Sequence, residues 1–351
     1  MYIKPEQFWR DVSEDFRPPV ILPDIGTFFN RDMQLAEQLM HHVANSGTRY
    51  IKGEILHDAD ICLPTSTTEN YLGIDATPVS ENYRNLIERK TVSLDDYRAL
   101  FSACENYHLG LVLSIYDLAG VDFAVEIGAC ALKIASTNIV HAPLIRACAA
   151  TGLPLLIDTG KSTLTEVQRA LQWARDAGAE RIVIEYSPPA PPAPLEKHNL
   201  QIVHDLAKLC GLPIGLSDHH HGEEILYAAT ALGCRVLEKG VCPTQNANDQ
   251  DVYHALPVDR LSDVISACHN IHTAMGAAHA AYPAPAQRPV ARMGLVTQQR
   301  LEPGDMISLD TVRFAFPTLG IPVEQWDEVE GNSVSQTIDA NTPLEWSHVS
   351  S

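Results

Sequence analysis

Three lysines lie inside apolar stretches of the sequence, where a charged side chain is costly to bury. Lys52 occurs in RYIKGEIL, Lys133 in CALKIAST and Lys239 in RVLEKGVC. A buried ammonium group has to pair with a carboxylate or meet an anionic ligand. Two interpretations stay open. In the first, each lysine is neutralised by a nearby carboxylate, for instance Lys239 by Glu238 or Asp24. In the second, the lysines converge on a phosphate or carboxylate group of a ligand.

Carboxylate, hydroxyl and imidazole groups end other apolar runs. Asp24 ends VILPD, Ser136 follows ALKIA, and Ser217 precedes His219 by two residues in GLSDHHH. Serine hydroxyls beside lysines suit a phosphate or carboxylate group, and His219 with Asp or Glu residues could ligate a divalent cation. No His-Glu-x-x-His or Gly-x-Ser-x-Gly motif is present, so neither a strong zinc site nor a nucleophile elbow is predicted. We expect several other histidines, His254 among them, to be surface or packing residues.

The elements that must position these groups repeat as an apolar run followed by an amphipathic stretch. Continuously apolar runs with polar ends are typical of parallel strands buried on both faces. The best helical pattern is 163–177, where Thr163 and Glu166 form a capping box and Gly178 ends the helix. Eight runs are predicted to be strands: Val20–Asp24, Tyr50–Gly53, Gly110–Ile115, Ala131–Ser136, Pro154–Asp158, Arg181–Tyr186, Pro213–Asp218 and Arg235–Lys239.

Eight strand-helix units predict an α/β protein built on a closed (β/α)8 TIM barrel. A doubly wound open sheet is the alternative, but the first run is not followed by the Gly-x-Gly-x-x-Gly fingerprint common in that fold. The segment 54–91 is too long for a simple connection, so we expect it to be an excursion over the barrel mouth. Catalytic groups of a barrel lie at the carboxyl ends of its strands, where most of the polar residues above are placed.

The composition changes near residue 280, where HAAYPAPAQRPVAR is rich in Ala and Pro. Such a composition is typical of a linker. We therefore predict a barrel domain at 1–280, a linker at 281–291 and a small β-rich domain at 292–351. The last is too small for a robust core of its own, so we expect it to dock on the barrel or on a second subunit.

Charge and composition limit the partners. The chain has 25 Lys and Arg against 44 Asp and Glu, a formal charge of −19, which argues against nucleic acid as the main partner. It has no apolar run long enough to span a membrane and no apolar signal core at its start, so we expect a cytoplasmic protein. None of the eight cysteines forms a Cys-x-x-Cys pair, and we expect reduced core thiols.

Several motifs together resemble one family over nearly the whole chain. They are DIGTFFN, YIKGE, LKIASTNIVHAPLI, LLIDTGKSTLTEV, IGLSDHH and ALGCRVLEKG. With these the chain resembles the sialic acid synthases and the related spore coat polysaccharide biosynthesis protein E. The tail VTQQRLEPGDMISLDTVRFAFPTLGI is similar to the antifreeze-like (SAF) module of that family, which has a β-clip fold.

The resemblance implies a phosphoenolpyruvate-dependent synthase, a transferase that makes a carbon-carbon bond in polysaccharide biosynthesis. It would join phosphoenolpyruvate to an amino sugar such as N-acetylmannosamine and release phosphate, while a divalent cation (Mn2+ or Mg2+) polarises the sugar aldehyde. It also implies a homodimer in which each SAF module caps the partner's barrel. The implied site has Asp24 and Lys52 as catalytic groups, His219 as a metal ligand, and as substrate-binding groups Lys52, Lys133, Ser136, Ser217 and Lys239.

The chain departs from the family pattern around the metal and the sugar. Gly240 replaces the histidine that would be the second metal ligand, so the cation would bind weakly unless Asp24, Glu54 or Asp218 compensates. An asparagine-histidine pair of the family is Phe28-Phe29 here. Ile115 stands where the family has a threonine that helps to hold the phosphate, and Asn138 stands where it has a glutamate that contacts the sugar. The neighbourhood of Phe316 corresponds to an arginine of the family that reaches the sugar bound in the partner subunit.

Two other functions remain as alternatives at this point. A metal-free aldolase on the same barrel would form a Schiff base through a lysine of depressed pKa, Lys52 or Lys239. A non-catalytic paralogue would bind a sugar or a partner enzyme of polysaccharide assembly without releasing phosphate.

Overall fold

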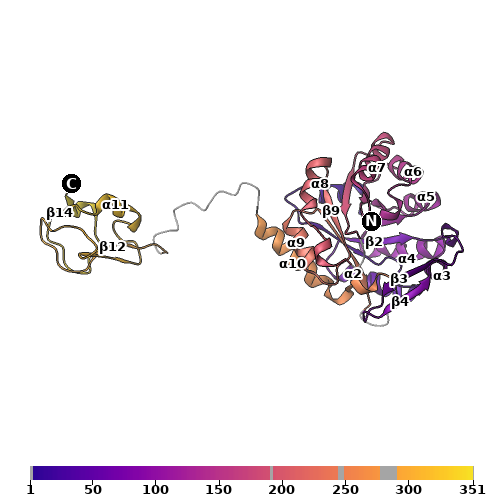
Figure 1. The fold of residues 1–351 in the computed structure, drawn as a ribbon, viewed down its shortest axis with the longest axis horizontal. Helices are drawn as coiled ribbons and strands as arrows, with labels where there is room; N and C mark the ends of the chain where they lie inside the picture. The colour runs from indigo at the N-terminus through magenta and orange to yellow at the C-terminus, as the bar shows by residue number, and fades with distance from the viewer. Residues whose placement is uncertain (1–2, 190–192, 244–248, 277–290, 351) are drawn as a thin grey trace. The chain divides into compact units, whose positions relative to one another are not determined.

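The computed structural model describes residues 3–189, 193–243, 249–276 and 291–350. The chain divides into two compact units, Met1–Ala277 and Ala278–Ser351, and each is described by itself (Figure 1). The predicted linker at 281–291 lies outside the described residues except for Ala291.

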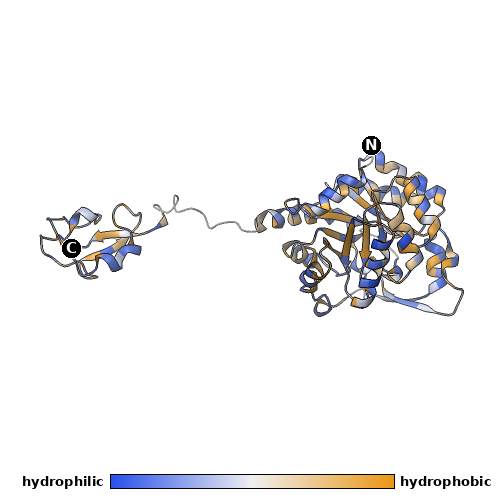
Figure 2. Ribbon diagram, turned by 90° about the horizontal axis from the view of Figure 1, so that it is seen from above, coloured by the Kyte–Doolittle hydropathy of each residue, from blue (hydrophilic) through white to orange (hydrophobic). Residues whose placement is uncertain are grey.

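The first unit is a closed parallel barrel, as predicted. Its strands follow one another in chain order, and β1 pairs with β10 to close the cylinder. Figure 2 shows these strands as largely hydrophobic ribbons, as expected for a sheet covered by helices on its outer face. The barrel strands are β1 (Val20–Asp24), β2 (Tyr50–Ile55), β5 (Gly110–Ile115), β6 (Ala131–Ile134), β7 (Leu155–Asp158), β8 (Ile182–Tyr186), β9 (Ile214–Asp218) and β10 (Val236–Cys242).

Helices surround the barrel (Figure 1). The capping box predicted for Thr163 and Glu166 is present at the start of α7. The helices are α1 (Pro5–Ser13), α2 (Met33–Asn45), α3 (Tyr83–Lys90), α4 (Leu94–Asn106), α5 (Leu118–Glu126), α6 (Ala142–Ala150), α7 (Leu164–Asp176), α8 (Ile202–Cys210), α9 (Glu224–Ala231) and α10 (Leu261–Met275). Among the described residues, no helix has the length and apolar character needed to cross a bilayer.

The inside of the barrel changes from apolar to polar along the strands. Side chains two residues apart on a strand share a face. On β10 the buried Val236 is therefore followed on the inner face by Glu238, and on β6 Ala131 is followed by Lys133. The lower layers belong to one apolar cluster, to which α1 contributes Phe8. The charged residues thus form the top layer of a well-packed barrel.

The excursion predicted for 54–91 is present. It contains a short helical turn at Ala59–Ile61, the antiparallel strands β3 (Thr68–Leu72) and β4 (Pro78–Asn82), and then α3. Several of its side chains line the cavity described below.

The second unit has a small core of its own. Leu295, Leu301, Ile307 and Leu344 are among its fully buried side chains. Its regular elements are short: β12 (Gly294–Thr297), β13 (Val312–Ala315), α11 (Trp326–Val329), β14 (Ser333–Val334) and β15 (Val349–Ser350).

Candidate active site

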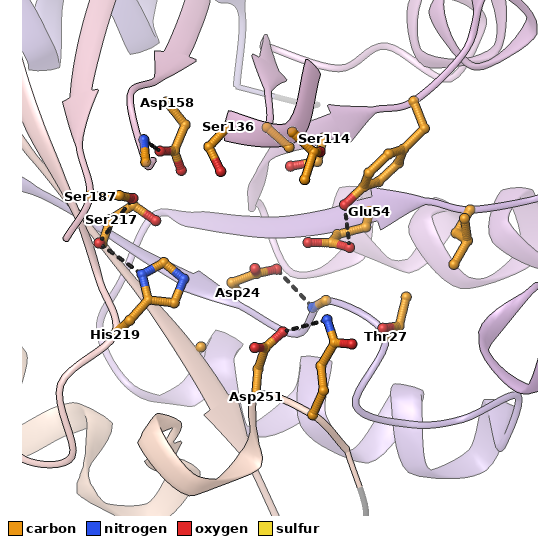
Figure 3. Close-up of a pocket in the computed structure, with 18 of the residues that line it drawn as sticks. Asp24, Thr27, Glu54, Ser114, Ser136, Asp158, Ser187, Ser217, His219 and Asp251 are labelled. Atoms are coloured by element: carbon orange, nitrogen blue, oxygen red, sulfur yellow. Dashed lines mark hydrogen bonds between the residues drawn. The ribbon is translucent and has the colours of Figure 1, made fainter. Parts of the chain in front are cut away.

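A cavity of about 740 Å³ opens at the carboxyl ends of the barrel strands. Figure 3 shows residues from several strand ends around this space, with Asp158, Ser136 and Ser114 on one side and Asp251 on another. Six of the seven predicted site residues line it: Asp24, Lys52, Lys133, Ser136, Ser217 and His219. The barrel geometry therefore brings together residues that are far apart in the sequence.

The seventh residue, Lys239, does not line the cavity. Its Nζ lies 2.7 Å from Asp218 Oδ2 and donates to the carbonyl oxygen of His220. Strand alternation explains this position, since Glu238 faces the barrel interior and its neighbour must face outward. Substrate binding by Lys239 therefore has no support in this geometry, and its partner is neither Glu238 nor Asp24.

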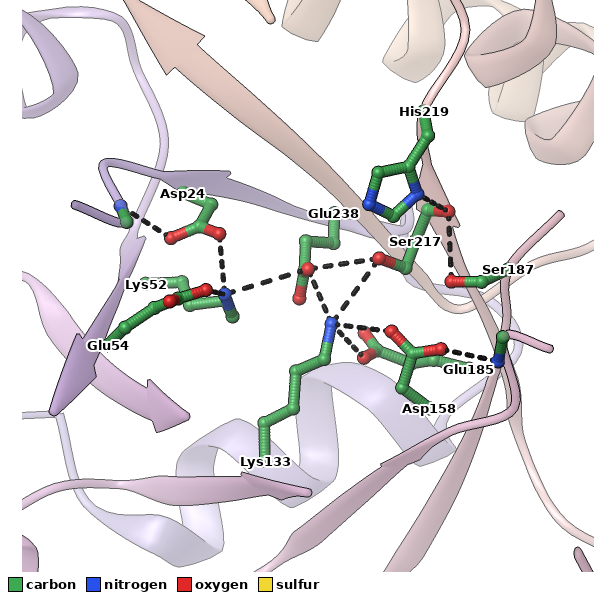
Figure 4. Close-up of polar contacts among 12 residues, drawn as sticks. Asp24, Lys52, Glu54, Lys133, Asp158, Glu185, Ser187, Ser217, His219 and Glu238 are labelled. Atoms are coloured by element: carbon green, nitrogen blue, oxygen red, sulfur yellow. Dashed lines mark hydrogen bonds and ion pairs between the residues drawn. The ribbon is translucent and has the colours of Figure 1, made fainter. Parts of the chain in front are cut away.

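Lys52 and Lys133 meet at a shared carboxylate. Glu238 Oε1 lies 2.5 Å from Lys133 Nζ and 3.7 Å from Lys52 Nζ (Figure 4). Ser217 Oγ is 3.3 Å from Lys133 Nζ and donates to the same glutamate oxygen at 3.1 Å. The two lysines thus converge, as the ligand hypothesis expected, but they converge on a carboxylate of the protein.

Carboxylates outnumber ammonium groups in this network. Lys133 Nζ also lies 3.1 Å from Asp158 and 3.2 Å from Glu185. Lys52 Nζ lies 2.5 Å from Asp24 and 3.5 Å from Glu54. Among the described residues, five carboxylates are thus within 3.7 Å of the two lysines. The site is therefore a mixed cluster of ammonium and carboxylate groups, in which carboxylates of the protein neutralise both lysines.

This crowding sets the protonation of the cluster. Burial raises the pKa of Asp24 to about 7, helped by Glu54 and Glu238 and opposed by Lys52. Burial likewise raises the pKa of Glu185 to about 8, against the attraction of Lys133. For Glu238, Lys133 and Lys52 outweigh the effect of burial and lower the pKa to about 2. Two carboxylates can therefore hold protons near neutral pH, while Glu238 stays ionised.

His219 has a defined ring orientation. Its Nδ1 lies 3.1 Å from the carbonyl oxygen of Ser217, which can only accept, so Nδ1 carries the hydrogen. In the neutral ring the lone pair is then on Nε2, the atom left to accept a proton or bind a cation.

The residues around His219 do not assemble a closed metal centre. Within the part of the chain that the structure describes, no three His, Cys, Asp or Glu side chains are placed to share an ion. Gly240 offers no ligand, and a Cβ there would lie 3.0 Å from Phe28 Cζ. Phe28 is buried with Cys242 and Val252 and thus closes the position above Gly240.

Sequence reasoning missed two groups at the cavity. His254 was expected to be a surface or packing residue, but it is buried, lines the cavity and lies with its ring centroid 5.0 Å from that of His219. Burial lowers its pKa to about 3, so the ring is neutral. Tyr116 lines the cavity and donates to Glu54 Oε2 at 3.0 Å. Neither residue stands in a local motif: Tyr116 directly follows β5, and His254 lies in the turn Val252–His254.

Comparison with known proteins fits this architecture. A family model described as the NeuB family matches residues 39–280, which is more than half of the chain. The chain belongs to the NeuB family. A SAF domain model matches residues 292–350. The predicted family and C-terminal module are therefore confirmed.

Curated relatives of this NeuB-family chain are distant but match over almost their full length. N,N'-diacetyllegionaminic acid synthase of Legionella pneumophila is 24% identical over 336 residues, which cover 94% of each chain. Pseudaminic acid synthase of Helicobacter pylori is 24% identical over 331 residues, 93% of this chain and 97% of that protein.

Solved structures show the same fold. N-acetylneuraminic acid synthetase of Leptospira borgpetersenii, in complex with citrate, aligns with a TM-score of 0.69 at 20% identity, covering 78% of this chain and 90% of that one. A putative spore coat polysaccharide biosynthesis protein E of Chromobacterium violaceum aligns with a TM-score of 0.68 at 17% identity, covering 95% of this chain and 100% of that one. At these identities the likeness concerns the fold of the NeuB-family chain.

Proposed function

We propose that this NeuB-family chain joins phosphoenolpyruvate to an amino sugar aldehyde and releases phosphate, in the biosynthesis of a surface polysaccharide. The relatives named as legionaminic and pseudaminic acid synthases support this activity. The observation that carries the proposal is the convergence of Lys52, Lys133 and Ser217 on the floor of a cavity at the strand ends.

The proposed roles follow from position. Lys52, Lys133, Ser136 and Ser217 hold the phosphate and carboxylate of phosphoenolpyruvate. The new bond joins C3 of phosphoenolpyruvate to the aldehyde carbon, whose oxygen takes up a proton. Water then adds at C2, and the intermediate collapses to a ketone as the C2–O bond to phosphate breaks. The phosphate and the solvent take up the two protons of that water. Asp24 supplies the proton to the aldehyde oxygen, since a pKa of about 7 suits general acid catalysis at neutral pH.

A divalent cation would be held weakly by this chain. His219 Nε2 is the available imidazole ligand, and Phe28 fills the space above Gly240. A single imidazole with water molecules does not make a strong site for Mn2+ or Mg2+. Protonated Asp24 is therefore the principal group that stabilises negative charge on the aldehyde oxygen.

The carboxylates around Lys52 and Lys133 compete with the anionic substrate for these ammonium groups. Glu185 is fully buried beside Lys133, and its pKa is raised to about 8. When Glu185 and Asp24 are protonated, the negative charge around the lysines falls by two. Phosphoenolpyruvate can then compete with the remaining carboxylates for the ammonium groups.

A Schiff-base aldolase fits less well. A nucleophilic lysine has to lose its proton, whereas Asp24, Glu238 and Glu54 outweigh burial and raise the pKa of Lys52. Lys239 is held by Asp218 away from the cavity lining. The second candidate is a non-catalytic sugar-binding protein, which is favoured by the carboxylates that already satisfy both lysines.

The test is phosphate release from phosphoenolpyruvate with a panel of N-acylated amino sugars, run with Mn2+ and with a chelator in parallel. Phosphate and a new acidic sugar, formed in equal amounts, would support the synthase. Sugar binding without phosphate release from any member of the panel would support the non-catalytic candidate. Light scattering of the full chain tests the proposed homodimer with exchanged SAF modules, which a monomer would contradict.

A further inference from the structure

Four lysines line the cavity, and three of them are already paired with carboxylates of the protein. The pairs are Lys52 with Asp24, Lys133 with Glu238 and Lys90 with Asp249, at distances of 2.5, 2.5 and 2.7 Å. A carboxylate at such a distance neutralises most of the charge that an anionic ligand would otherwise meet. The fourth is Lys161, which lies in the turn between β7 and α7.

Lys161 has an unpaired ammonium group. Its Nζ makes no ion pair or hydrogen bond within the described ranges, and the residues outside them include no Asp or Glu. Asp158, three residues earlier, is engaged elsewhere. Its Oδ2 lies 3.1 Å from Lys133 Nζ, and its Oδ1 accepts from the backbone nitrogen of Gly160 at 2.9 Å. Lys161 therefore brings to the cavity a positive charge that the described carboxylates leave available.

Two serine hydroxyls of the cavity lining also lack protein partners. Ser114 on β5 is only 1% exposed, and its Oγ finds no partner among the residues that the structure describes. The hydroxyl of Ser136, just after β6, likewise makes no hydrogen bond to that part of the chain. A buried hydroxyl without a partner is costly, so these two groups are suited to donate to a ligand.

These three residues follow neighbouring strands and lie on one side of the cavity. The strands β5, β6 and β7 are adjacent in the barrel. A Cβ at Gly160 would lie 3.1 Å from Ser136 Oγ, so the turn that carries Lys161 packs against Ser136. Figure 3 shows Ser136 between Asp158 and Ser114. We call Ser114, Ser136 and Lys161 the donor wall.

The turn that carries Lys161 is held before any ligand binds. Besides the bond from Gly160 to Asp158, the hydroxyl of Ser162 donates to the carbonyl oxygen of Gly160 at 3.1 Å. The backbone nitrogen of Ser162 donates to the carbonyl oxygen of Thr159, also at 3.1 Å. Binding therefore has to order the side chain of Lys161 but not its backbone, which keeps the entropic cost small.

We infer that the donor wall binds a phosphate dianion, with Lys161 as its cation and Ser114 and Ser136 as hydrogen-bond donors. The three terminal oxygens of a phosphate group match one ammonium and two hydroxyl donors. The inference rests on the proposed function for the molecule that carries the phosphate, which is phosphoenolpyruvate. It makes Lys161 a specificity-determining residue for phosphate and leaves the carboxylate of phosphoenolpyruvate to the lysines of the floor.

Calorimetry with three probes tests the wall without requiring turnover. The probes are inorganic phosphate, phosphoenolpyruvate and pyruvate, which has the carboxylate without the phosphate. Lys161→Gln should weaken the first two about tenfold and leave pyruvate unchanged, whereas Lys161→Arg, which keeps the charge, should retain most of the affinity. The loss in Lys161→Gln should shrink at high salt, because an exposed charge is screened. A purely structural effect would not depend on salt in this way.

The chain offers a matched control for the charge. Lys208, in the last turn of α8, is exposed and does not line the cavity. Lys208→Gln should therefore bind all three probes as the parent does. Ser114→Ala removes no hydrogen bond of the described structure, so it should unfold in urea as the parent does. Its affinity for inorganic phosphate should nevertheless fall about threefold to tenfold.

The outcomes separate the wall from the synthase. Phosphate binding that is weakened in Lys161→Gln, in a parent that releases no phosphate with any acceptor, keeps the wall and overturns the synthase. A working synthase whose KM for phosphoenolpyruvate and affinity for phosphate are unchanged in Lys161→Gln keeps the synthase and overturns the wall. Equal losses in Lys161→Gln and Lys208→Gln, an equal loss for pyruvate, or a parent that binds neither phosphate nor phosphoenolpyruvate would also overturn it.

Discussion

Glu238 Oε1 accepts a hydrogen bond from Lys133 Nζ at 2.5 Å across the interior of the barrel. Both side chains are almost completely buried, and the same oxygen faces Lys52 Nζ at 3.7 Å. One carboxylate therefore links the two lysines that are proposed to hold phosphoenolpyruvate. Any substrate anion has to compete with Glu238, or share the lysines with it.

Replacing Lys133→Met should be costly for the fold as well as for binding. The change leaves Glu238, Asp158 and Glu185 without their common cation, and breaking a buried ion pair in this way costs about 3–5 kcal/mol. Denaturant unfolding should show this loss, and calorimetry should show no phosphoenolpyruvate binding. The double variant Lys133→Met/Glu238→Gln should recover part of the stability but not the binding. Unchanged affinity in Lys133→Met would remove the lysine from the site.

The stability of the barrel should fall as the pH rises towards 8. The pKa of Glu185 is raised from 4.5 to about 8, so the folded protein keeps a proton that the unfolded chain releases above pH 4.5. This contribution is complete below pH 4.5 and is lost as the pH rises through the folded pKa. Glu185→Gln removes the titration, so its stability relative to the parent should increase between pH 5.5 and 8.5.

Urea unfolding at these two pH values measures the effect. The control is Glu180→Gln, which makes the same change at an exposed glutamate that precedes β8. Loss of the Glu185 proton should also affect the substrate: phosphoenolpyruvate should bind more weakly at pH 8.5 than at pH 6.5. Glu185→Gln should flatten part of that profile, because Asp24 also titrates in this range. A profile unaltered by Glu185→Gln would place the titrating group elsewhere.

Much of the site was predictable because strand ends are visible in a sequence. Asp24, Lys133 and Ser217 each lie at or near the end of an apolar run that forms a barrel strand. A closed barrel brings the ends of its strands together. Strand alternation could also have excluded Lys239, because Glu238 and Lys239 are neighbours on β10 and must face opposite ways. The alternation of side chains along β10 therefore predicts that Lys239 points away from the side of the strand that carries Glu238.

The rest of the site depends on contacts between distant segments, which no local pattern encodes. Lys133 and Glu238 are 105 residues apart in the chain and meet because the barrel closes. His254 belongs to the short turn Val252–His254, and it meets the ring of His219, 35 residues earlier in the chain. The conformation of the excursion between β2 and α4 likewise depends on contacts between separate segments, such as those of Arg84 with the carbonyl oxygens of Ala59 and Cys62.

Metal binding should be weak in the parent and should improve only when two positions change together. A side chain at position 240 would collide with Phe28, 3.0 Å from the Cβ position, so Gly240→His alone should not gain affinity for Mn2+. The double variant Phe28→Ala/Gly240→His opens the space and adds a second imidazole near His219. Electron paramagnetic resonance titration should show at least tenfold tighter Mn2+ binding in the double variant. Tight binding by the parent, abolished in His219→Ala, would contradict the prediction.

The position of Lys52 depends on the absence of a side chain at its neighbour. A Cβ at Gly53 would lie 2.5 Å from Phe101 Cζ, and Phe101 is buried in α4 behind β2. Gly53→Ala has to displace either the ring or the strand, so it should cost about 1–3 kcal/mol of stability in urea unfolding. Displacement of the strand would also move Lys52, and the affinity for phosphoenolpyruvate should fall severalfold. Adding Phe101→Leu should restore part of both losses, with Phe101→Leu alone as the reference. If Gly53→Ala binds and unfolds as the parent does, the strand is not held by this contact.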